Sequence, residues 1–359
     1  MRRIYLLAVF IPVAIALQLG NASDTAIFFT AALGIVPTAQ LMSDATEALA
    51  ERAGPGIGGL LNVTFGNAPE LIIAIFALAD GLHEVVKASL VGSVMGNVLL
   101  VMGFAMLTGG LRQGRQRFTR ELVWAQSRAL LVTVIVLVAM AVVRAIAGGS
   151  LPGATDRHPH YSHALNGISL VVAVGLLMTY AVGLGYDLRH RRGQFAPVTD
   201  TDVQEETWSV RTSIALLAVA GALVGVMSDV LVHSIEGASK AVGLSPFFIG
   251  VFVVGIAGNA AEHWVAVVVA MKNKMDLALS IAIGSSVQIA MFVVSLLVLL
   301  SFALGPHPMA LVFNGYEIAG LLVAGAVAAL VTRDGRSTWQ EGVVLLAAYA
   351  ALGAVFALA

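Results

Sequence analysis

Apolar stretches of about 20 residues, separated by short polar segments, recur along the whole chain. A helix of that length crosses about 30 Å of hydrocarbon, so each stretch predicts one transmembrane helix. Little chain remains for a soluble domain, and any binding chemistry must therefore lie inside the helix bundle or in its short loops. Eleven helices are predicted, at residues 4–20, 26–49, 57–80, 85–109, 128–148, 164–187, 210–234, 246–271, 277–304, 310–332 and 341–358.

The composition agrees with an all-α polytopic membrane protein. Of 359 residues, 58% are hydrophobic and 11% are charged, and the mean hydropathy is +0.91; soluble proteins carry roughly 25% charged residues. The chain has no cysteine, which excludes disulfides, thiolate metal sites and thiol catalysis. The net charge of −1 argues neither for nor against nucleic acid, but the sequence shows no basic fold that would bind it, and the expected partners are calcium, protons and the lipid bilayer.

The distribution of lysine and arginine predicts the orientation. With the N-terminus inside, 16 of the 20 basic residues fall on cytoplasmic loops or flanks, and the exceptions are Lys87, Arg144, Arg157 and Lys240. Cytoplasmic loops carry an excess of these residues. We therefore expect a protein of a prokaryotic inner membrane with a cytoplasmic N-terminus and an outside C-terminus. Residues 1–23 also resemble a signal peptide, and cleavage there would leave ten helices with the same orientation.

Two polar motifs interrupt the apolar pattern at related positions. GNAPEL occupies residues 66–71 and GNAAEH occupies residues 258–263. A Gly-Ser pair follows each motif glycine after 26 residues, at 92–93 and at 284–285. A shared offset over two separate motifs indicates two copies of one unit. Because each copy holds five helices, the second enters the membrane from the opposite face, as in the inverted repeats of secondary transporters.

The repeat predicts the organisation of the chain. MSDATEALA at 42–50 is echoed, with a gap, by MSDVLVHSIEGA at 227–238. The predicted units are a first transmembrane helix at 1–22, a first repeat at 23–193, an acidic cytoplasmic linker at 194–209 and a second, inverted repeat at 210–359.

Glu70 and Glu262 are predicted to meet at the pseudo-two-fold axis, because each lies near the middle of its transmembrane helix. Asn67 and Asn259 precede them by three residues and share their helix faces. The glycines and Pro69 should weaken both helices locally and free backbone carbonyls. Oxygen ligands with two negative charges suit a hard divalent cation, and calcium better than magnesium. Without a cation, the two carboxylates repel each other and should take up protons.

The paired motifs, each followed by a helix containing Gly-Ser, resemble the two signature repeats of the calcium/proton antiporter (CAX) family within the cation/calcium exchanger superfamily. The resemblance covers about 330 residues. It implies alternating access, calcium as the transported substrate with no cofactor, and Glu70 and Glu262 as ion ligands, with His263 as a neighbour. It also implies that Gly96 departs from the pattern, since a serine is expected there. The implied polar lining consists of Ser93, Asn97, Ser285, Ser286 and Gln288.

Structural roles compete with several of these assignments. A glutamate could join helices by hydrogen bonding, but an intramembrane acid is functional by default, and Glu70 has a symmetry mate. The asparagines could hold helices together, and the serines could simply permit close packing. His263 could pack against a neighbouring helix, although imidazole titrates in a range useful for proton traffic.

Four further acids are predicted to form entry vestibules. Asp44 and Glu47 end the second predicted helix on the cytoplasmic side, and Asp229 and Glu236 end the seventh on the outer side. Symmetric acidic mouths would concentrate cations, although ordinary interfacial acids would do nothing special. The linker DTDVQEE resembles, by its position, the acidic calcium-sensing or gating helix of the CAX family, but it is short and could be a solvated linker only. Its acids are Asp200, Asp202, Glu205 and Glu206.

The sequence therefore predicts a secondary antiporter, not an enzyme, that exchanges cytosolic calcium for external protons. The first alternative is a sodium/calcium exchanger, which should need more acidic or polar groups near the midplane. A cation channel is less consistent with inverted broken-helix repeats. A hydrolase using Ser285 or Ser286 with His263 lacks a nucleophile elbow. The pattern leaves the oligomeric state open, including a homo-oligomer.

Overall fold

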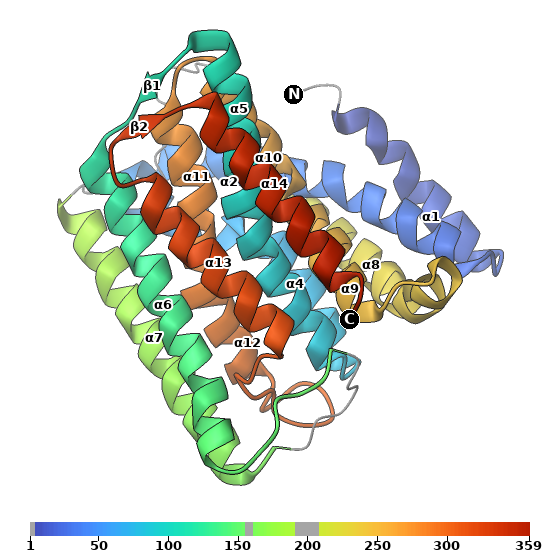
Figure 1. Cartoon of the computed structure of the whole chain (residues 1–359). Helices are drawn as coiled ribbons and strands as arrows, with labels where there is room; N and C mark the ends of the chain where they lie inside the picture. The colour runs from blue at the N-terminus through green and yellow to red at the C-terminus, as the bar shows by residue number, and fades with distance from the viewer. Residues whose placement is uncertain (1–3, 155–160, 191–207) are drawn as a thin grey trace.

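The computed structural model describes residues 4–154, 161–190 and 208–359, and these are almost entirely helical. Figure 1 shows α6 and α7 along one edge of the molecule and α1, the start of α2 and α8 on the opposite side. In chain order the helices are η1 Ile4–Val9, α1 Phe10–Leu19, α2 Asp24–Gly66, α3 Ala68–Ala79, α4 His83–Met95, η2 Gly96–Val101, α5 Met102–Gln113, α6 Arg120–Ile146, α7 His163–His190, α8 Val210–Val242, α9 Pro246–Ile249, η3 Gly250–Val254, α10 Gly255–Met271, α11 Met275–Gln288, η4 Ile289–Val293, α12 Val294–Leu300, α13 Gly315–Val331 and α14 Trp339–Phe356.

Each predicted transmembrane segment contains helix. Among the described residues, eight helices are long and apolar enough to cross a membrane, or nine if one bent pair counts as a single span. Two shorter apolar helices, Ile4–Leu19 and Gly315–Val331, accompany them. Helix ends differ by up to eight residues: α6 begins eight residues before the predicted residue 128, α8 ends eight residues after the predicted residue 234, and α13 begins five residues after the predicted residue 310.

The second and third predicted helices form one continuous element up to Gly66, where a loop at about residues 50–56 was predicted. That element is sharply bent, as the close approach of Gly58 to Ala50 shows: a Cβ added to Gly58 would collide with the backbone of Ala50. In a straight helix, residues eight apart are separated by about 12 Å. The glycines and the proline between residues 54 and 59 favour such a bend.

The helices that carry the Gly-Ser pairs lie at the centre of the bundle. Every residue of α4 is buried, and all but two residues of α11 are buried. Each of these helices then passes into a π-helical turn, η2 after α4 and η4 after α11. Such turns are rare and are frequently found at functional sites. The two turns begin three and four residues after Ser93 and Ser285, so the irregularity is repeated in both halves of the chain.

Helices α2 and α8 pack against each other through reciprocal contacts. A Cβ added to Gly221 on α8 would lie 3.2 Å from the Met42 methyl carbon, and one added to Gly34 on α2 would lie 3.1 Å from the Met227 sulfur. Each methionine thus rests on a glycine of the other helix. Both methionines begin an MSD sequence, so the echo noted between 42–50 and 227–238 corresponds to matching positions in the packing.

A two-stranded sheet joins two loops at one end of the molecule (Figure 1). Strand β1, Gln116–Arg117, pairs antiparallel with β2, Arg336–Ser337. The Gln116 side chain donates a hydrogen bond of 2.9 Å to the carbonyl of Ala270, at the end of α10. These loops are therefore tied to the helix that carries the second motif.

Candidate functional site

The first motif lies at a break between two helices. Helix α2 ends at Gly66, α3 begins at Ala68, and the two meet at an angle of 45°. Pro69 lies in the first turn of α3, where its missing N–H leaves no donor unpaired. In an uninterrupted helix its ring would collide with the carbonyl of Phe65, four residues earlier. The predicted weakening of the helix is confirmed here, and it places Glu70 in the first turn of α3.

The second motif lies within an uninterrupted helix. Helix α10 runs from Gly255 to Met271, and Ala261 stands where the first motif has Pro69. The prediction that the glycine would also weaken this helix is wrong, because alanine keeps its N–H and favours the helix. The irregular turn of this segment, η3, lies just before the motif. The two halves of the site are therefore similar in residues and different in backbone.

The two glutamates cross over between the motifs. A Cβ added to Gly258 would lie 2.7 Å from Oε1 of Glu70, and one added to Gly66 would lie 3.6 Å from Oε1 of Glu262. Each carboxylate thus lies against the glycine of the other motif. The motif glycines leave the room that the carboxylates occupy.

Glu70 is a buried acid without hydrogen-bond partners. Its side chain is 7% exposed, and within the described residues neither carboxylate oxygen has a partner. Glu262 is half-buried. A buried carboxylate without a partner is costly as an anion, so this arrangement favours a bound cation or a bound proton.

The motif asparagines connect the two halves of the chain. Asn67 donates a hydrogen bond of 2.6 Å to Gln288 and accepts one of 3.0 Å from Ser285. In the other half, Asn259 donates a hydrogen bond of 3.0 Å to Ser93. The two asparagines therefore have matching partners, each on the Gly-Ser helix of the opposite half.

His263 belongs to the same site through a contact with η2, the turn that follows α4. Its Nε2 lies 2.9 Å from Oδ1 of Asn97, in the π-helical turn η2. A Cβ added to Gly96 would lie 3.9 Å from Cε1 of this histidine. Glycine at the position where a serine was expected therefore leaves the neighbouring asparagine as the polar contact.

Ser286 is placed differently from the other predicted lining residues. It is fully buried, and its hydroxyl donates a hydrogen bond of 2.9 Å to the carbonyl of Ala282 on its own helix. Ser285, one residue earlier, bonds to Asn67 instead. Successive residues point about 100° apart around a helix, which separates the two serines. A role for Ser286 in ion binding stays a prediction.

The arrangement offers oxygen ligands rather than a dense metal cluster. Among the described residues, no three His, Cys, Asp or Glu side chains come together as a metal site would require. The two carboxylates are supplemented by neutral oxygens, and Oδ1 of Asn259 is buried with no hydrogen-bond partner in the described chain. Such a set of oxygen ligands matches hard cations, which prefer oxygen.

The predicted vestibule acids lie within helices, not at helix ends as predicted. Asp44 lies inside α2, where it accepts hydrogen bonds of 2.5 Å from Tyr5 and 2.6 Å from Gln40. Glu47, one turn later, is exposed. Their roles as cation attractors stay predictions.

The acids on α8 also lie inside a helix longer than predicted. The Asp229 carboxylate lies 3.4 Å from Nδ1 of His233. Glu236 lies 4.0 Å from Lys240. The linker acids Asp200, Asp202, Glu205 and Glu206 lie outside the described residues.

A second group of buried charges was not predicted from the sequence as a site. Lys87 was counted among the outside positive charges, yet its side chain is 1% exposed. It lies 2.5 Å from Glu84, and Glu317 is completely buried nearby in the bundle. The spacing of Glu84 and Lys87, three residues apart on a helix, was the available signal.

The chain is similar to several known proteins over most of its length. The family model for the sodium/calcium exchanger protein matches residues 23–188 and 212–358. The chain is 38% identical over 373 residues to the Ca(2+)/H(+) antiporter of Aphanothece halophytica, covering 98% of this chain and 95% of that protein. It is 38% identical over 354 residues to the Ca(2+)/H(+) antiporter ChaA of Bacillus subtilis, covering 97% of each. The crystal structure of the Ca2+/H+ antiporter protein YfkE superimposes with a TM-score of 0.84 at 35% identity, covering both chains fully.

Proposed function

Since the chain belongs to the sodium/calcium exchanger protein family, we propose that it is a membrane antiporter that exchanges cytosolic calcium for external protons. The observation that carries this proposal is the crossed carboxylate pair, in which Glu70 and Glu262 each lie against the glycine of the other motif. Two carboxylates neutralise one divalent cation. The same two carboxylates accept protons when the cation leaves.

The residues of the site have distinct roles in this proposal. Glu70 and Glu262 bind calcium or protons in turn. Oδ1 of Asn259 supplies a neutral oxygen, since it is buried without a partner in the described chain. Asn67, Ser285 and Gln288 hold the first motif to the second half of the chain.

The remaining polar residues line the opposite half. Ser93 holds Asn259, and Asn97 holds the ring of His263. Calcium binding would order these groups around the ion, and no covalent chemistry is required. His263 is assigned to proton or ion traffic beside the pair.

Transport by alternating access follows from the proposed inverted repeats, 23–193 and 210–359. The matching contacts of the two asparagines and of the two methionines are what a pseudo-two-fold axis produces. Rocking one bundle against the other would open the carboxylate pair to each side of the membrane in turn. With the N-terminus in the cytoplasm, the acidic exterior loads protons and releases calcium outside.

The decisive experiment measures calcium uptake into proteoliposomes that contain the purified protein. A proton gradient should drive uptake and a sodium gradient of equal size should not. Glu70→Gln and Glu262→Gln should each reduce uptake to the level of empty liposomes, because each removes one of the two charges that neutralise calcium. Uptake driven by sodium alone, or normal uptake by either variant, would overturn the proposal.

A further inference from the structure

The two-stranded sheet, which lies where α6 and α14 begin, exposes a pair of arginines (Figure 1). Arg117 on β1 is the partner of Arg336 on β2, so two positive side chains lie directly opposite each other. Their strand neighbours Gln116 and Ser337 are buried, and both arginines are exposed. Opposite residues have Cβ atoms about 5 Å apart, and like charges at that separation are destabilising. The sheet therefore carries a repulsion that a negative group would relieve.

Two further arginines extend this pair along α6. A Cβ added to Gly335, beside Arg336, would lie 3.3 Å from Cβ of Arg120, the first residue of α6. The guanidinium carbon of Arg120 lies 5.7 Å from the centre of the Trp124 ring, and that of Arg128 lies 4.0 Å from it. Both distances are typical of cation–π contacts, so the two groups gather at one ring. We call Arg117, Arg120, Arg128, Arg336 and Trp124 the arginine patch.

The arginine patch has positive charge that this part of the chain does not neutralise. Among the described residues, none of its four arginines forms an ion pair with a carboxylate. Of the acids on the same loops, Asp334 and Asp276 each accept a hydrogen bond from a backbone N–H. Glu341 belongs to the capping box of α14, and Glu121 is exposed. The guanidinium groups are therefore available to an anion of another molecule.

The length of α6 places the arginine patch at the surface of the bilayer. The helix has 27 residues, which span about 40 Å, whereas the hydrocarbon core is about 30 Å thick. Residues 129–143 carry no charge, so the excess length lies at the start of the helix, among its charged residues. Trp124 and the exposed Trp339, at the start of α14, fit this level, because tryptophan is enriched at membrane interfaces.

An exposed apolar face continues from the arginine patch into the hydrocarbon. Val132 and Ile135 follow Arg128 by four and seven residues, so the three side chains share one face of α6. Arg128 is exposed, and Val132 and Ile135 are 60% and 54% exposed. A soluble anion could contact only the charged part of this face. A phospholipid could contact both parts, with its phosphate on the arginines and its chains on the aliphatic side chains.

From this continuity we propose that the arginine patch binds the headgroup of an anionic phospholipid, whose acyl chains lie along Val132 and Ile135. Arginine suits phosphate because its planar guanidinium group can donate two parallel hydrogen bonds to phosphate oxygens. The negative headgroup also offsets the repulsion between Arg117 and Arg336. In the predicted orientation the lipid belongs to the cytoplasmic leaflet, where basic surfaces attract anionic lipids.

The lipid should stabilise more than the sheet. Gln116, next to Arg117, donates a hydrogen bond to the carbonyl of Ala270 at the end of α10, and to Oδ1 of Asn273 beyond it. Relief of the repulsion in the sheet therefore also supports the contact of these loops with α10. Because the lipid binds the folded protein, it should raise the melting temperature of the whole molecule.

The test is thermal unfolding of the purified full-length protein in detergent with added lipid. Phosphatidylglycerol should raise the melting temperature by about 3 °C or more, and phosphatidylcholine with the same acyl chains should not. Arg128→Gln should remove at least about half of this shift, because it removes a phosphate ligand. Arg117→Gln combined with Arg336→Gln should do the same. Without lipid, the double variant should melt no lower than the parent protein, since it has lost the repulsion.

The matched control is Arg211→Gln, which changes an exposed arginine in the first turn of α8, outside the arginine patch. This variant should keep the full shift with phosphatidylglycerol. Inorganic phosphate at the same concentration should stabilise none of the proteins, and stabilisation equal to that by the lipid would indicate a site for a soluble anion and overturn the proposal. An equal shift with phosphatidylcholine, or an unchanged shift in Arg128→Gln, would also overturn it. The outcome is independent of the proposed antiport, because no transport is measured.

Discussion

At the scale of single residues, the motif glycines matter because carboxylates lie against them. Gly258 is the tighter of the two: a Cβ there would lie 2.7 Å from the Glu70 carboxylate, against 3.6 Å for Gly66 and Glu262. A separation under 3 Å requires the carboxylate to move, whereas 3.6 Å is ordinary van der Waals contact. The two glycines therefore have different tolerance for a methyl group.

Gly258→Ala should displace the Glu70 carboxylate and weaken calcium binding. We expect the calcium concentration for half-maximal transport to rise at least about tenfold, which corresponds to about 1.4 kcal/mol of binding free energy. Gly66→Ala should have a smaller effect. The control is Gly175→Ala on α7, where the added Cβ meets nothing within 4 Å. Alanine favours a helix over glycine by about 1 kcal/mol, so a loss of activity at Gly258 with an unchanged melting temperature would reflect the site. Equal activity of the Gly258 and Gly175 variants would contradict this account.

At the scale of helices, the two motifs differ because one has a proline. Pro69 breaks the first helix at Asn67, and Ala261 lets the second continue. The break turns α3 by 45° relative to the end of α2 and sets the direction from which Glu70 enters the site. The helix geometry of the site is thus unequal although its side chains match.

Pro69→Ala should allow the helix to continue through the motif and move Glu70. Proline is tolerated in the first turn of a helix, so Pro69→Ala should leave the melting temperature close to that of the parent protein while exchange falls at least about tenfold, or about 1.4 kcal/mol of transition-state stabilisation. Pro246→Ala is the control, because that proline lies in the first turn of α9 and interrupts no helix. Exchange rates in proteoliposomes and thermal unfolding would be measured together. Full exchange by the Pro69 variant would show that the break is dispensable.

At the scale of the whole molecule, acids far from the pair would act through their fields. Glu47 is exposed on α2, and Glu236 lies 4.0 Å from Lys240, which partly offsets its charge. Long-range attraction is screened by salt, with a Debye length of about 10 Å at 0.1 M. The effect of each acid should therefore depend on ionic strength.

Glu47→Gln should raise the calcium concentration for half-maximal transport by about two- to fivefold at low ionic strength, and by less at about 1 M salt, where the Debye length is about 3 Å. Glu236→Gln should show the same dependence on ionic strength. Initial rates of calcium transport at several salt concentrations would provide the measurement. An effect independent of salt would instead indicate direct coordination or gating by these residues.

Proton exchange also belongs to the whole molecule, because it couples the site to both sides of the membrane. Glu70 is buried without partners in the described chain, so it should hold a proton when no cation is present. Calcium addition to the protein in weak buffer should then release protons. Binding should weaken as pH falls, by up to about tenfold per pH unit for each proton displaced. Glu70→Gln should reduce the proton release, and no release from the parent protein between about pH 6 and 8 would exclude proton exchange.

The sequence alone determined the features that depend on local composition and on repetition. Runs of apolar residues predicted where helices lie, because a helix in lipid must satisfy its own backbone and cover it with apolar side chains. The repeated GNAPEL and GNAAEH motifs identified Glu70 and Glu262, because acids in such runs are rare. The break at Pro69 also followed from a local rule about proline.

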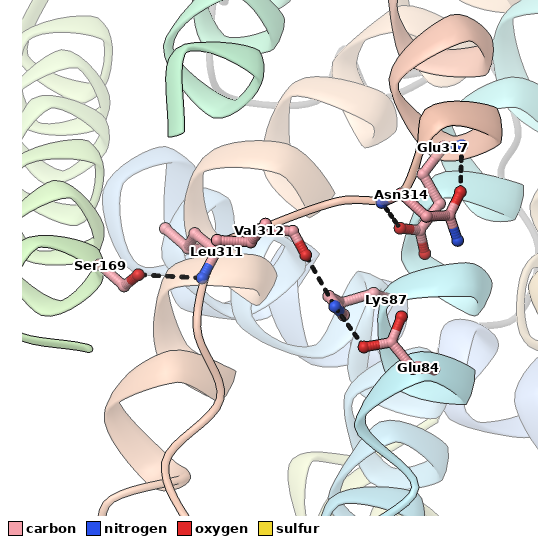
Figure 2. Close-up of polar contacts among 7 residues, drawn as sticks. All are labelled: Glu84, Lys87, Ser169, Leu311, Val312, Asn314 and Glu317. Atoms are coloured by element: carbon pink, nitrogen blue, oxygen red, sulfur yellow. Dashed lines mark hydrogen bonds and ion pairs between the residues drawn. The ribbon is translucent and has the colours of Figure 1, made fainter. Parts of the chain in front are cut away.

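Only the tertiary structure decided what depends on contacts between distant segments. Ser285 and Ser286 are equivalent in sequence, but only Ser285 faces Asn67, since neighbouring helix positions point about 100° apart. Helix α13 begins at Gly315, five residues later than predicted. The backbone of residues 309–313 can remain non-helical because side chains from α4, α7 and the end of α12 form hydrogen bonds with it. Lys87 counts as an interfacial charge in the sequence and becomes a buried one in the fold. Its ammonium group is paired with Glu84 and donates to the carbonyl of Val312, 225 residues away (Figure 2). A local sequence pattern cannot predict a contact between segments so far apart in the chain.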